Sequence, residues 1–362
     1  MNVVAPVPKS SLVSSFNEWD PLEEVIVGRM EGAVVPAWDV ALDATMPTEQ
    51  KAYFEQHAGK PWREDYLAAA ISELDAFAGL LTRMGITVTR PDPVPKNIPY
   101  ETPAWKSPGG LYNAMPRDCL LVVGDLMIEA PMAWRSRFHE TDAFRPLLKH
   151  YFRSGARWIA APRPQLLDET YNPDYDRENP FESGRFAVTE FEPTFDAADF
   201  MRCGRDIYVQ KSHVTNDFGI DWVAQQLGGE YAVHRVDMCD SAPMHIDASL
   251  MPLAPGKLLI NEGRVKTVPA QFRNWEVRVA PAPILDPGHT LYMSSAWLSM
   301  NVLMLDPKTV VVEKHETVMQ EFFDQWGFEV IPVDFHNVIR FGGAFHCVTC
   351  DVRRAGSLQS YV

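Results

Sequence analysis

Two cysteines, Cys347 and Cys350, stand close together near the end of the chain in the stretch FHCVTC. A structural zinc site needs about four nitrogen or sulfur ligands. The pair supplies half of such a site, and the sequence holds no second C-x-x-C. A redox pair is expected beside a βαβ pattern, whereas β-branched and charged residues follow Cys350. A nucleophilic thiolate needs a histidine or another cation nearby to lower its pKa. Metal ligand, redox pair, nucleophile and inert thiol all stay open from these residues alone.

His245 is a candidate partner for such a thiolate. It lies in PMHIDASL, two residues before Asp247. Asp196 lies in the apolar stretch FDAADF, where a carboxylate is costly to bury unless it is paired. In one interpretation, His245 is a hydrogen-bonded structural residue, and Asp196 caps a helix or pairs with Arg202 or Arg205. In the other interpretation, a carboxylate orients a catalytic imidazole, as in a nucleophile–base–orienter triad.

Four more polar residues are ambiguous on their own. Asp118 closes the turn MPRD and opens the strand CLLVV, a position typical of a cap or turn residue. Arg264, in NEGRV at the end of a strand, fits either a surface residue or a carboxylate clamp. Ser294 and Ser295, in LYMSSAWL, fit turn formers equally well. Residue type and position alone assign no role to any of the four.

The charge of the chain restricts its partners. The 362 residues include 48 acidic and 33 basic side chains, which gives a formal net charge of −15. Nucleic acid and anionic membranes bind basic patches through counterion release, so we expect neither as a partner. The acidic field favours a small cationic substrate, although solubility alone also explains it.

Cysteine usage and hydropathy indicate the compartment. Five cysteines are an odd number in a long chain, which argues for reduced thiols and against a disulfide framework. The N-terminal stretch has no charged segment followed by a long apolar run, and no eighteen consecutive residues are apolar. We therefore expect a cytoplasmic protein.

The elements that must position these residues follow a recurring pattern. An apolar helical stretch, a Gly or Asn stop and a short β-rich run recur five times, at residues 67–90, 144–162, 220–236, 268–281 and 316–333. In the first unit, apolar residues recur at helical spacing from Leu67 to Leu81, and Gly85 stands where a helix C-cap is expected. The pattern predicts a helix followed directly by a strand in each unit.

A further apolar, β-branched run precedes each of these units, at residues 23–28, 118–131, 206–212, 256–261 and 301–313. Strands that alternate with helices favour an α/β fold in which helices cover sheet. The sequence contains neither G-x-G-x-x-G nor G-x-x-x-x-G-K-[ST], so nucleotide binding has no motif support. We expect one domain over residues 1–362, built from five α/β modules around a pseudo-fivefold axis.

Six long segments, in order along nearly the whole chain, resemble the arginine amidinotransferases of the pentein superfamily. They are FNEWDPLEEVIVG (16–28), MPRDCLLVVGDLMIEAPMAWRSRF (115–138), FDAADFMRCGRDIYVQKSHVTN (195–216), PMHIDASLMPLAPGKLLIN (243–261), MSSAWLSMNVLMLD (293–306) and GGAFHCVTCDVRRAGSLQSY (342–361). The resemblance implies a five-bladed α/β propeller, with pseudo-fivefold repeats of a ββαβ-type module around a central active site. It also implies a homodimer.

The family moves the amidino group of L-arginine to an amine and releases L-ornithine, by a ping-pong route through a covalent amidino-cysteine. The resemblance implies that Cys347 is the nucleophile, His245 the general acid and base, and Asp196 the partner of that histidine. It makes Cys350 a bystander. Six residues are implied in substrate binding: Asp118 and Asp247 for the guanidinium, Arg264, Ser294 and Ser295 for the α-carboxylate, and Met244 in the same pocket.

The chemistry is consistent with these residue types. A guanidinium is planar, cationic and weakly electrophilic, so carboxylates must hold it while its carbon faces a soft nucleophile. The leaving nitrogen needs a proton and the entering amine must lose one, and a single imidazole serves both steps. Asp196 is expected to favour the charged imidazole, which in turn favours the Cys347 thiolate. No metal or organic cofactor is required.

The acceptor amine differs among members of the family: glycine, lysine, an aminocyclitol phosphate or polyketide-derived amines. The segment CDSAPMHID has Ala242 where the resemblance to the glycine enzyme leads us to expect an asparagine, on a flap over the pocket. Because a smaller side chain admits a longer acceptor, we expect an ω-amino acid such as lysine, or else glycine. The alternative reaction is hydrolysis of the same adduct, as in arginine deiminase-like enzymes of the superfamily.

Overall fold

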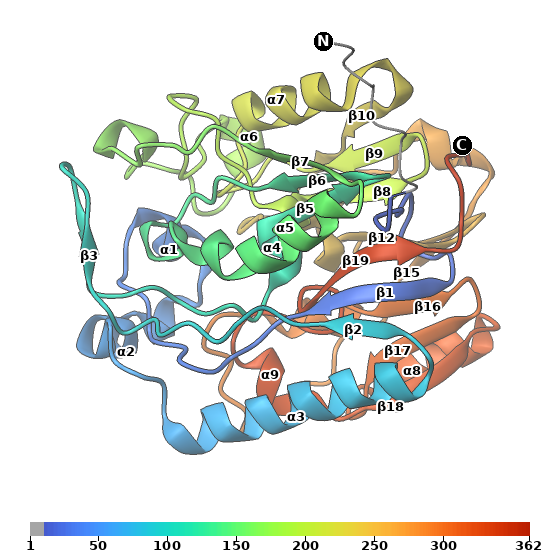
Figure 1. The fold of residues 1–362 in the computed structure, drawn as a ribbon, viewed down its shortest axis with the longest axis horizontal. Helices are drawn as coiled ribbons and strands as arrows, with labels where there is room; N and C mark the ends of the chain where they lie inside the picture. Colours follow the sequence, from blue (N-terminus) through green and yellow to red (C-terminus); the bar gives the residue numbers. More distant parts are fainter. Residues whose placement is uncertain (1–10) are drawn as a thin grey trace, which may run out of the picture.

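The computed structural model describes residues 11–362 and shows a mixed α/β fold (Figure 1). Five three-stranded sheets contain most of the strands. They are β19 (Thr349–Arg354), β1 (Leu22–Val27) and β2 (Thr87–Thr89); β5 (Leu120–Val123), β6 (Leu126–Glu129) and β7 (Arg157–Ala160); β8 (Phe200–Cys203), β9 (Asp206–Val209) and β10 (Ala232–Arg235); β12 (Leu250–Ala254), β13 (Lys257–Ile260) and β15 (Glu276–Val279); and β16 (Leu303–Asp306), β17 (Thr309–Glu313) and β18 (Glu329–Val333). Two short pairs join β3 (Tyr100–Glu101) to β4 (Lys106–Ser107) and β11 (Asp237–Met238) to β14 (Val265–Thr267).

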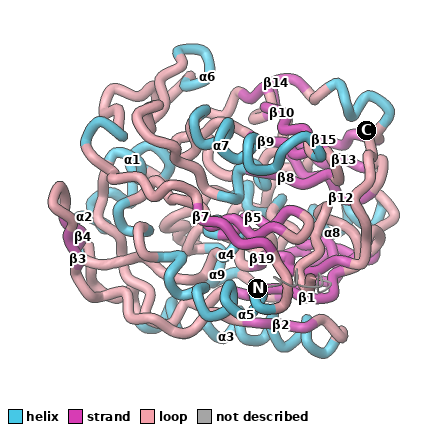
Figure 2. The backbone as a smooth tube through the Cα atoms, turned by 45° about the horizontal axis from the view of Figure 1, so that its top comes forward, coloured by secondary structure: helices cyan, strands magenta, loops and turns pink. Residues whose placement is uncertain are grey.

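Helices flank the sheets, and long stretches of loop separate the regular elements (Figure 2). The helices α3 and α7 lie at opposite ends of the molecule, at the bottom and top of Figure 1. None of the helices in residues 11–362 combines the length and the apolar character needed to span a membrane. The α-helices are α1 (Val40–Thr45), α2 (Lys51–His57), α3 (Glu64–Arg83), α4 (Pro116–Cys119), α5 (Arg145–Arg153), α6 (Pro180–Ser183), α7 (Asp217–Leu227), α8 (Thr317–Gln325) and α9 (His336–Ile339).

The five sheets share one pattern of pairing. In each, the central strand pairs antiparallel with one neighbour and parallel with the other. In four of them the antiparallel partners are joined by a tight turn. Gly124 (φ 61°) and Gly204 (φ 69°) occupy such turns, between β5 and β6 and between β8 and β9, in the left-handed region that glycine adopts without steric cost.

The five predicted helix–strand units are present, with one difference. The helices α3, α5, α7 and α8 lead into the strands β2, β7, β10 and β18. In the fourth unit, the residues after Pro269 form a five-residue 3₁₀ helix, Ala270–Asn274, before β15. The prediction of an α-helical stretch is wrong there, because so short a segment gains too few α-helical hydrogen bonds to offset the cost of nucleation.

The two ends of the described chain meet in one sheet (Figure 1). Strand β1 pairs antiparallel with β19, so that Val27 faces Thr349 and Ile26 faces Cys350. Beyond the ladder, the backbone N–H of Gly28 donates to the carbonyl of Val348 at 2.9 Å. Because Cys347 lies just before β19, this pairing of distant segments sets its place in the fold.

The two cysteines of the C-x-x-C belong to different parts of the core. Cys347 lies in an apolar cluster that also contains the buried face of α3. Cys350 lies in a second cluster, built mainly from the β5–β7 and β8–β10 sheets, and its Sγ is 3.6 Å from the carbonyl oxygen of Leu120. Both thiols are free. Their spacing in sequence therefore does not make them a pair in space.

Candidate active site

Five of the predicted site residues occupy corresponding places, one before a strand of each of the five sheets. A short turn or helix stands immediately before the outer antiparallel strand of each sheet, and neighbouring turns contact one another. These turns bring Asp118 (in α4) before β5, Asp196 before β8, His245 before β12, Ser295 before β16 and Cys347 before β19. Residues far apart in the sequence thus meet because the same position of each module lies at, or directly behind, the same interior space.

That space is a cavity of about 100 Å³. The Asp196 carboxylate is not among its lining groups and instead stands behind the imidazole of His245. Ala242, from the predicted flap, also lines the cavity. The other eight predicted site residues line it as well: Asp118, Met244, His245, Asp247, Arg264, Ser294, Ser295 and Cys347.

Asn301 holds the turn that carries Cys347. Its Oδ1 accepts hydrogen bonds from the backbone N–H groups of Ala344, His346 and Cys347, each at 3.1 Å. Its Nδ2 donates to the Cys347 Sγ at 3.1 Å. Asn301 is not among the predicted site residues, because an asparagine in a strand-flanking turn is common and nothing in its neighbours indicates a thiol partner.

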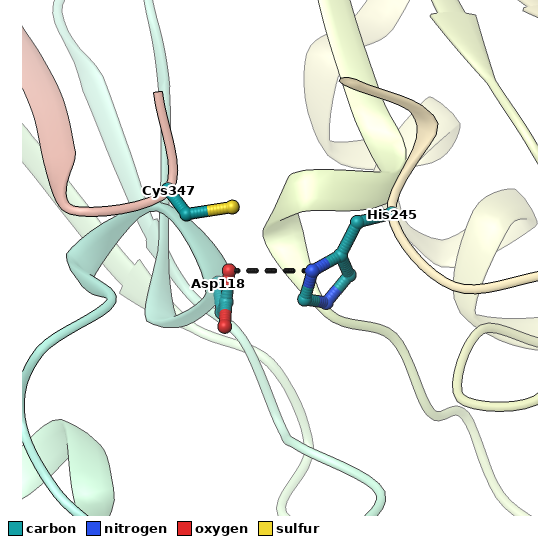
Figure 3. A group of neighbouring side chains, drawn as sticks. All are labelled: Asp118, His245 and Cys347. Carbon is teal, nitrogen blue, oxygen red and sulfur yellow. Dashed lines mark ion pairs between the residues drawn. The ribbon is translucent and has the colours of Figure 1, made fainter. Parts of the chain in front are cut away.

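The His245 imidazole lies between two carboxylates. Its Nε2 is 3.0 Å from Oδ2 of Asp196, and its Nδ1 is 3.6 Å from Oδ1 of Asp118. Figure 3 shows Cys347 and Asp118 together on the side of the ring that faces the cavity. The backbone of His245 has φ 61°, a region that costs a residue with a side chain about 1–3 kcal/mol. The fold maintains this strained conformation at the residue that carries the candidate acid and base.

Arg137 is the second residue that sequence reasoning missed. Its buried guanidinium lies 2.9 Å from Oδ2 of Asp118 and 3.3 Å from Oδ2 of Asp196. It also makes two hydrogen bonds to Glu140, at 2.7 and 2.8 Å. The sequence WRSRF gives no sign that one of its two arginines is buried. Only its contacts identify Arg137 as the cation that holds both carboxylates beside His245.

Asp196 therefore pairs with Arg137, and the alternative pairing with Arg202 is wrong. Arg202 is buried at a different place, where it binds Glu18 at 2.5 Å and Asp351 at 2.7 Å. Arg205, the other alternative, donates to the backbone carbonyl of Glu230. Sequence proximity suggested these partners, but the strand β8 points Arg202 away from the cavity and toward the N-terminal segment.

Two carboxylate oxygens at the cavity have no hydrogen-bond partner: Oδ1 of Asp118 and Oδ1 of Asp247. The other oxygen of Asp247 accepts from Nδ1 of His346 at 2.8 Å and from the Cys347 thiol at 3.5 Å. A buried acceptor without a partner costs about 1–3 kcal/mol. The two free oxygens therefore form an acceptor pair that a buried cation with several N–H donors would satisfy.

His346 stabilises this arrangement from the side opposite the cavity. Its Nδ1 faces Asp247 and its Nε2 lies 3.2 Å from Glu18. Both ring nitrogens thus face carboxylates, which fixes the orientation of the ring. In sequence, His346 seemed only a neighbour of Cys347; in the structure it orients the carboxylate next to the thiol.

The predicted carboxylate-binding residues are only partly joined. Arg264 donates to Oγ of Ser295 at 3.2 Å and also lies 3.3 Å from Oδ2 of Asp240. Ser294 lines the cavity, but its hydroxyl donates to the carbonyl of Ile339 at 2.7 Å and not toward Arg264. Of the two serines that were predicted to act with Arg264, only Ser295 is hydrogen-bonded to it.

The charges set the protonation of the central groups. Burial lowers the pKa of His245, but Asp118 and the hydrogen bond with Asp196 raise that pKa well above its ordinary value. Burial raises the pKa of Asp118 to about 6, against the opposing charges of His245 and Arg137. Burial and the Asp247 carboxylate also raise the pKa of Cys347 to about 12, although His245 opposes this. These pKa shifts favour a charged imidazole on His245, as expected. They favour a neutral thiol on Cys347, however, instead of the expected thiolate.

Known proteins resemble this chain along nearly its whole length, although no family model matches it. An L-arginine:L-lysine amidinotransferase from Pseudomonas savastanoi pv. phaseolicola is 49% identical over 354 residues, which cover 98% of this chain and 98% of the relative. A mitochondrial glycine amidinotransferase from Gallus gallus is 46% identical over 365 residues, which cover 99% of this chain and 86% of the relative.

Solved structures agree with these relatives. An amidinotransferase of the saxitoxin biosynthetic pathway from Microseira wollei has 46% identity and a TM-score of 0.90, with 97% of this chain and 100% of that chain covered. The inosamine-phosphate amidinotransferase from Streptomyces griseus has 38% identity and a TM-score of 0.87, with 97% and 99% covered. DDAH from Pseudomonas aeruginosa, at 17% identity and a TM-score of 0.55, shares only the fold. The chain therefore belongs to the amidinotransferase family, and it is a transferase enzyme with the pentein fold.

Proposed function

We propose that the protein transfers the amidino group of L-arginine to a primary amine, through a covalent amidino-Cys347 intermediate, and releases L-ornithine. The observation that carries the proposal is one cavity where a thiol, an imidazole and two unpartnered carboxylate oxygens converge. The soft nucleophile, the proton carrier and the cation-binding acceptors are the groups that guanidinium chemistry requires.

The donor is positioned by charge at both ends. Its guanidinium donates to Oδ1 of Asp118 and Oδ1 of Asp247, the two oxygens that lack hydrogen-bond partners. The Cys347 thiol donates to the other oxygen of Asp247, at 3.5 Å, so the guanidinium carbon lies beside the sulfur. At the other end, Arg264 and Ser295 bind the α-carboxylate through charge-assisted hydrogen bonds.

In the first half-reaction, the Cys347 thiol loses its proton to solvent as the cationic donor binds, and the resulting thiolate forms a bond to the guanidinium carbon. The bond from that carbon to the nitrogen of the ornithine chain then breaks, and His245 gives this nitrogen a proton. Nε2 of His245 is engaged by Asp196, so the proton comes from Nδ1, which faces the cavity. L-ornithine leaves as an amine, and the amidino group stays on Cys347.

In the second half-reaction, the acceptor amine occupies the space that ornithine has left. Its nitrogen attacks the amidino carbon and loses a proton to Nδ1 of His245. The carbon–sulfur bond breaks and the electron pair returns to Cys347. When the product leaves, the thiolate takes up a proton from solvent, which completes the cycle without a net change in the enzyme. Asp118 and Asp247 hold the amidino group throughout, because it stays cationic and planar before and after each transfer.

We infer that the acceptor is an ω-amino acid such as lysine, with glycine as the second candidate. Ala242 lines the cavity beside Met244, and its small side chain leaves length for an acceptor with an aliphatic chain. The relative at 49% identity is named for lysine as the acceptor, and one at 46% for glycine. Because these identities are close, the choice rests mainly on the space at Ala242.

We also infer that the five sheets are the blades of one propeller-like domain over residues 1–362. Their common pairing pattern supports this, as do the corresponding places of the site residues before the outer strand of each sheet. The homodimer and the cytoplasmic location stay predictions.

The decisive experiment separates the two half-reactions. Intact-protein mass after incubation with L-arginine alone is expected to show one amidino adduct, absent in Cys347→Ser and retained in the matched control Cys350→Ser. A panel of amines that includes lysine and glycine is then added, and ornithine, citrulline and the amidino product are measured. An adduct on Cys350 would overturn the nucleophile assignment, and citrulline formed without any amine would favour the hydrolase alternative.

A further inference from the structure

Three side chains at the cavity form a set of metal ligands. The Cys347 sulfur, one His245 ring nitrogen and one Asp118 carboxylate oxygen all lie within 4.8 Å of one another, and all three residues are buried (Figure 3). Thiolate, imidazole and carboxylate are the ligand types that Zn²⁺ prefers, and three protein ligands leave a fourth position for water. This set differs from the C-x-x-C that the sequence offered, since it uses Cys347 without Cys350.

The spacing of the nitrogen and oxygen ligands fits a tetrahedral ion. Nitrogen and oxygen ligands lie at about 2.0–2.2 Å from Zn²⁺, which places two of them roughly 3.3–3.5 Å apart at a tetrahedral angle. The distance between Nδ1 of His245 and Oδ1 of Asp118 is 3.6 Å. A shift of a few tenths of an ångström is therefore sufficient for both atoms to bind one ion.

The nitrogen and oxygen ligands already have the outer partners that a metal site requires. Nε2 of His245 is held by Asp196 at 3.0 Å, which leaves Nδ1 for the ion, and Oδ2 of Asp118 is held by Arg137 at 2.9 Å, which leaves Oδ1. Oδ1 of Asp118 has no hydrogen-bond partner. Metal-binding histidines almost always donate their other N–H to a carboxylate or carbonyl in this way, and such partners raise metal affinity by about 10–100-fold.

We propose that Zn²⁺, or another thiophilic divalent cation, binds Cys347, His245 and Asp118 and blocks the enzyme. Binding forms bonds from the ion to Sγ, Nδ1 and Oδ1, and any protons on Sγ and Nδ1 pass to solvent. The ion is an inhibitor here and not a cofactor, because it occupies the nucleophile and the proton carrier. The acidic character of the cavity, suited to a guanidinium, also attracts the metal cation.

The competition with the donor rests on the proposed function, whereas the binding site itself does not. The guanidinium of the donor is expected to use Oδ1 of Asp118 and to react at the sulfur of Cys347, and the metal uses the same two atoms. Binding of L-arginine and of Zn²⁺ is then mutually exclusive. An amidino group on Cys347 likewise removes the thiolate ligand.

The first test measures binding on the metal-free full chain and involves no catalysis. Calorimetric titration with ZnCl₂ is expected to show one site in the wild type, in Cys350→Ser and in Cys239→Ser, which removes an exposed thiol. Cys347→Ser and His245→Gln should lose at least about 100-fold in affinity, and Asp196→Asn about 10–100-fold. With CoCl₂, the wild type should show a thiolate-to-cobalt charge-transfer band that is absent in Cys347→Ser.

Three results would overturn the site: no stoichiometric binding to the wild type, equal affinity in Cys347→Ser, or loss of binding in Cys350→Ser.

The second test measures ornithine formation at several Zn²⁺ and L-arginine concentrations, with EDTA as the reversal control. Competitive inhibition is expected. Zinc bound at the site but not competitive with L-arginine would leave the metal site standing and contradict the proposed donor position. Ornithine formation without zinc binding would contradict the metal site alone.

Discussion

Donor binding is predicted to create the nucleophile. In the free enzyme, burial and Asp247 raise the pKa of Cys347 to about 12. At pH 8 only about one thiol in 10⁴ is then ionised. A guanidinium placed about 4 Å from the sulfur adds roughly 4 kcal/mol of attraction at an effective dielectric constant near 20, which multiplies the thiolate population about 1,000-fold. The bound donor thus places a positive charge beside the sulfur. In the free enzyme, the charge of His245 alone does not offset burial and Asp247.

Two pH profiles measure this coupling. Alkylation of Cys347 by iodoacetamide, quantified by peptide mass, should rise about tenfold per pH unit between about pH 6 and pH 10 without a plateau. Rapid-quench formation of the amidino adduct at saturating L-arginine should begin to level off at about pH 9, because a roughly 1,000-fold gain in thiolate lowers the apparent pKa of Cys347 from about 12 to about 9. Asp247→Asn should speed alkylation, because it removes the nearby carboxylate that raises the thiol pKa, even as it weakens donor binding. Alkylation that reaches a plateau below about pH 8 would instead indicate a resting thiolate–imidazolium pair.

Three further predictions concern the groups around the reacting atoms. Asp196→Asn should lower kcat about 10–150-fold, because the charged hydrogen bond to His245, worth about 1.5–3 kcal/mol, is lost. An unchanged rate of adduct formation would contradict this role. Arg137→Met should destabilise the fold by about 3–5 kcal/mol in urea unfolding, because Asp118 and Asp196 lose their buried cation, with Arg137→Lys closer to the wild type. Arg264→Met should raise the KM for L-arginine about 10–150-fold. The KM for agmatine should not change, because agmatine lacks the α-carboxylate. An equal effect on both substrates would place the carboxylate elsewhere.

Much of the molecule was predictable from local patterns. Apolar residues at helical spacing followed by β-branched runs predicted the helix–strand units, because both signals depend on neighbours a few residues apart. The failure at 268–274 has the same cause, since an isolated short stretch carries too little local signal to separate an α-helix from a 3₁₀ turn. The predicted chemical groups were also present in the residue types, with Cys347, His245 and the aspartates standing in long segments that resemble one family.

The relations between distant residues were not predictable in this way. The pairing of β1 with β19 joins the two ends of the described chain, the turns before four separate strands line one cavity, and the turn before β8 places Asp196 behind His245. Arg137, Asn301 and His346 acquire their roles only there, because a buried ion pair or hydrogen bond depends on which groups the fold desolvates together. The protonation of Cys347 also depends on the fold. Its neighbours in sequence do not predict its charge, whereas its burial beside Asp247 raises its pKa.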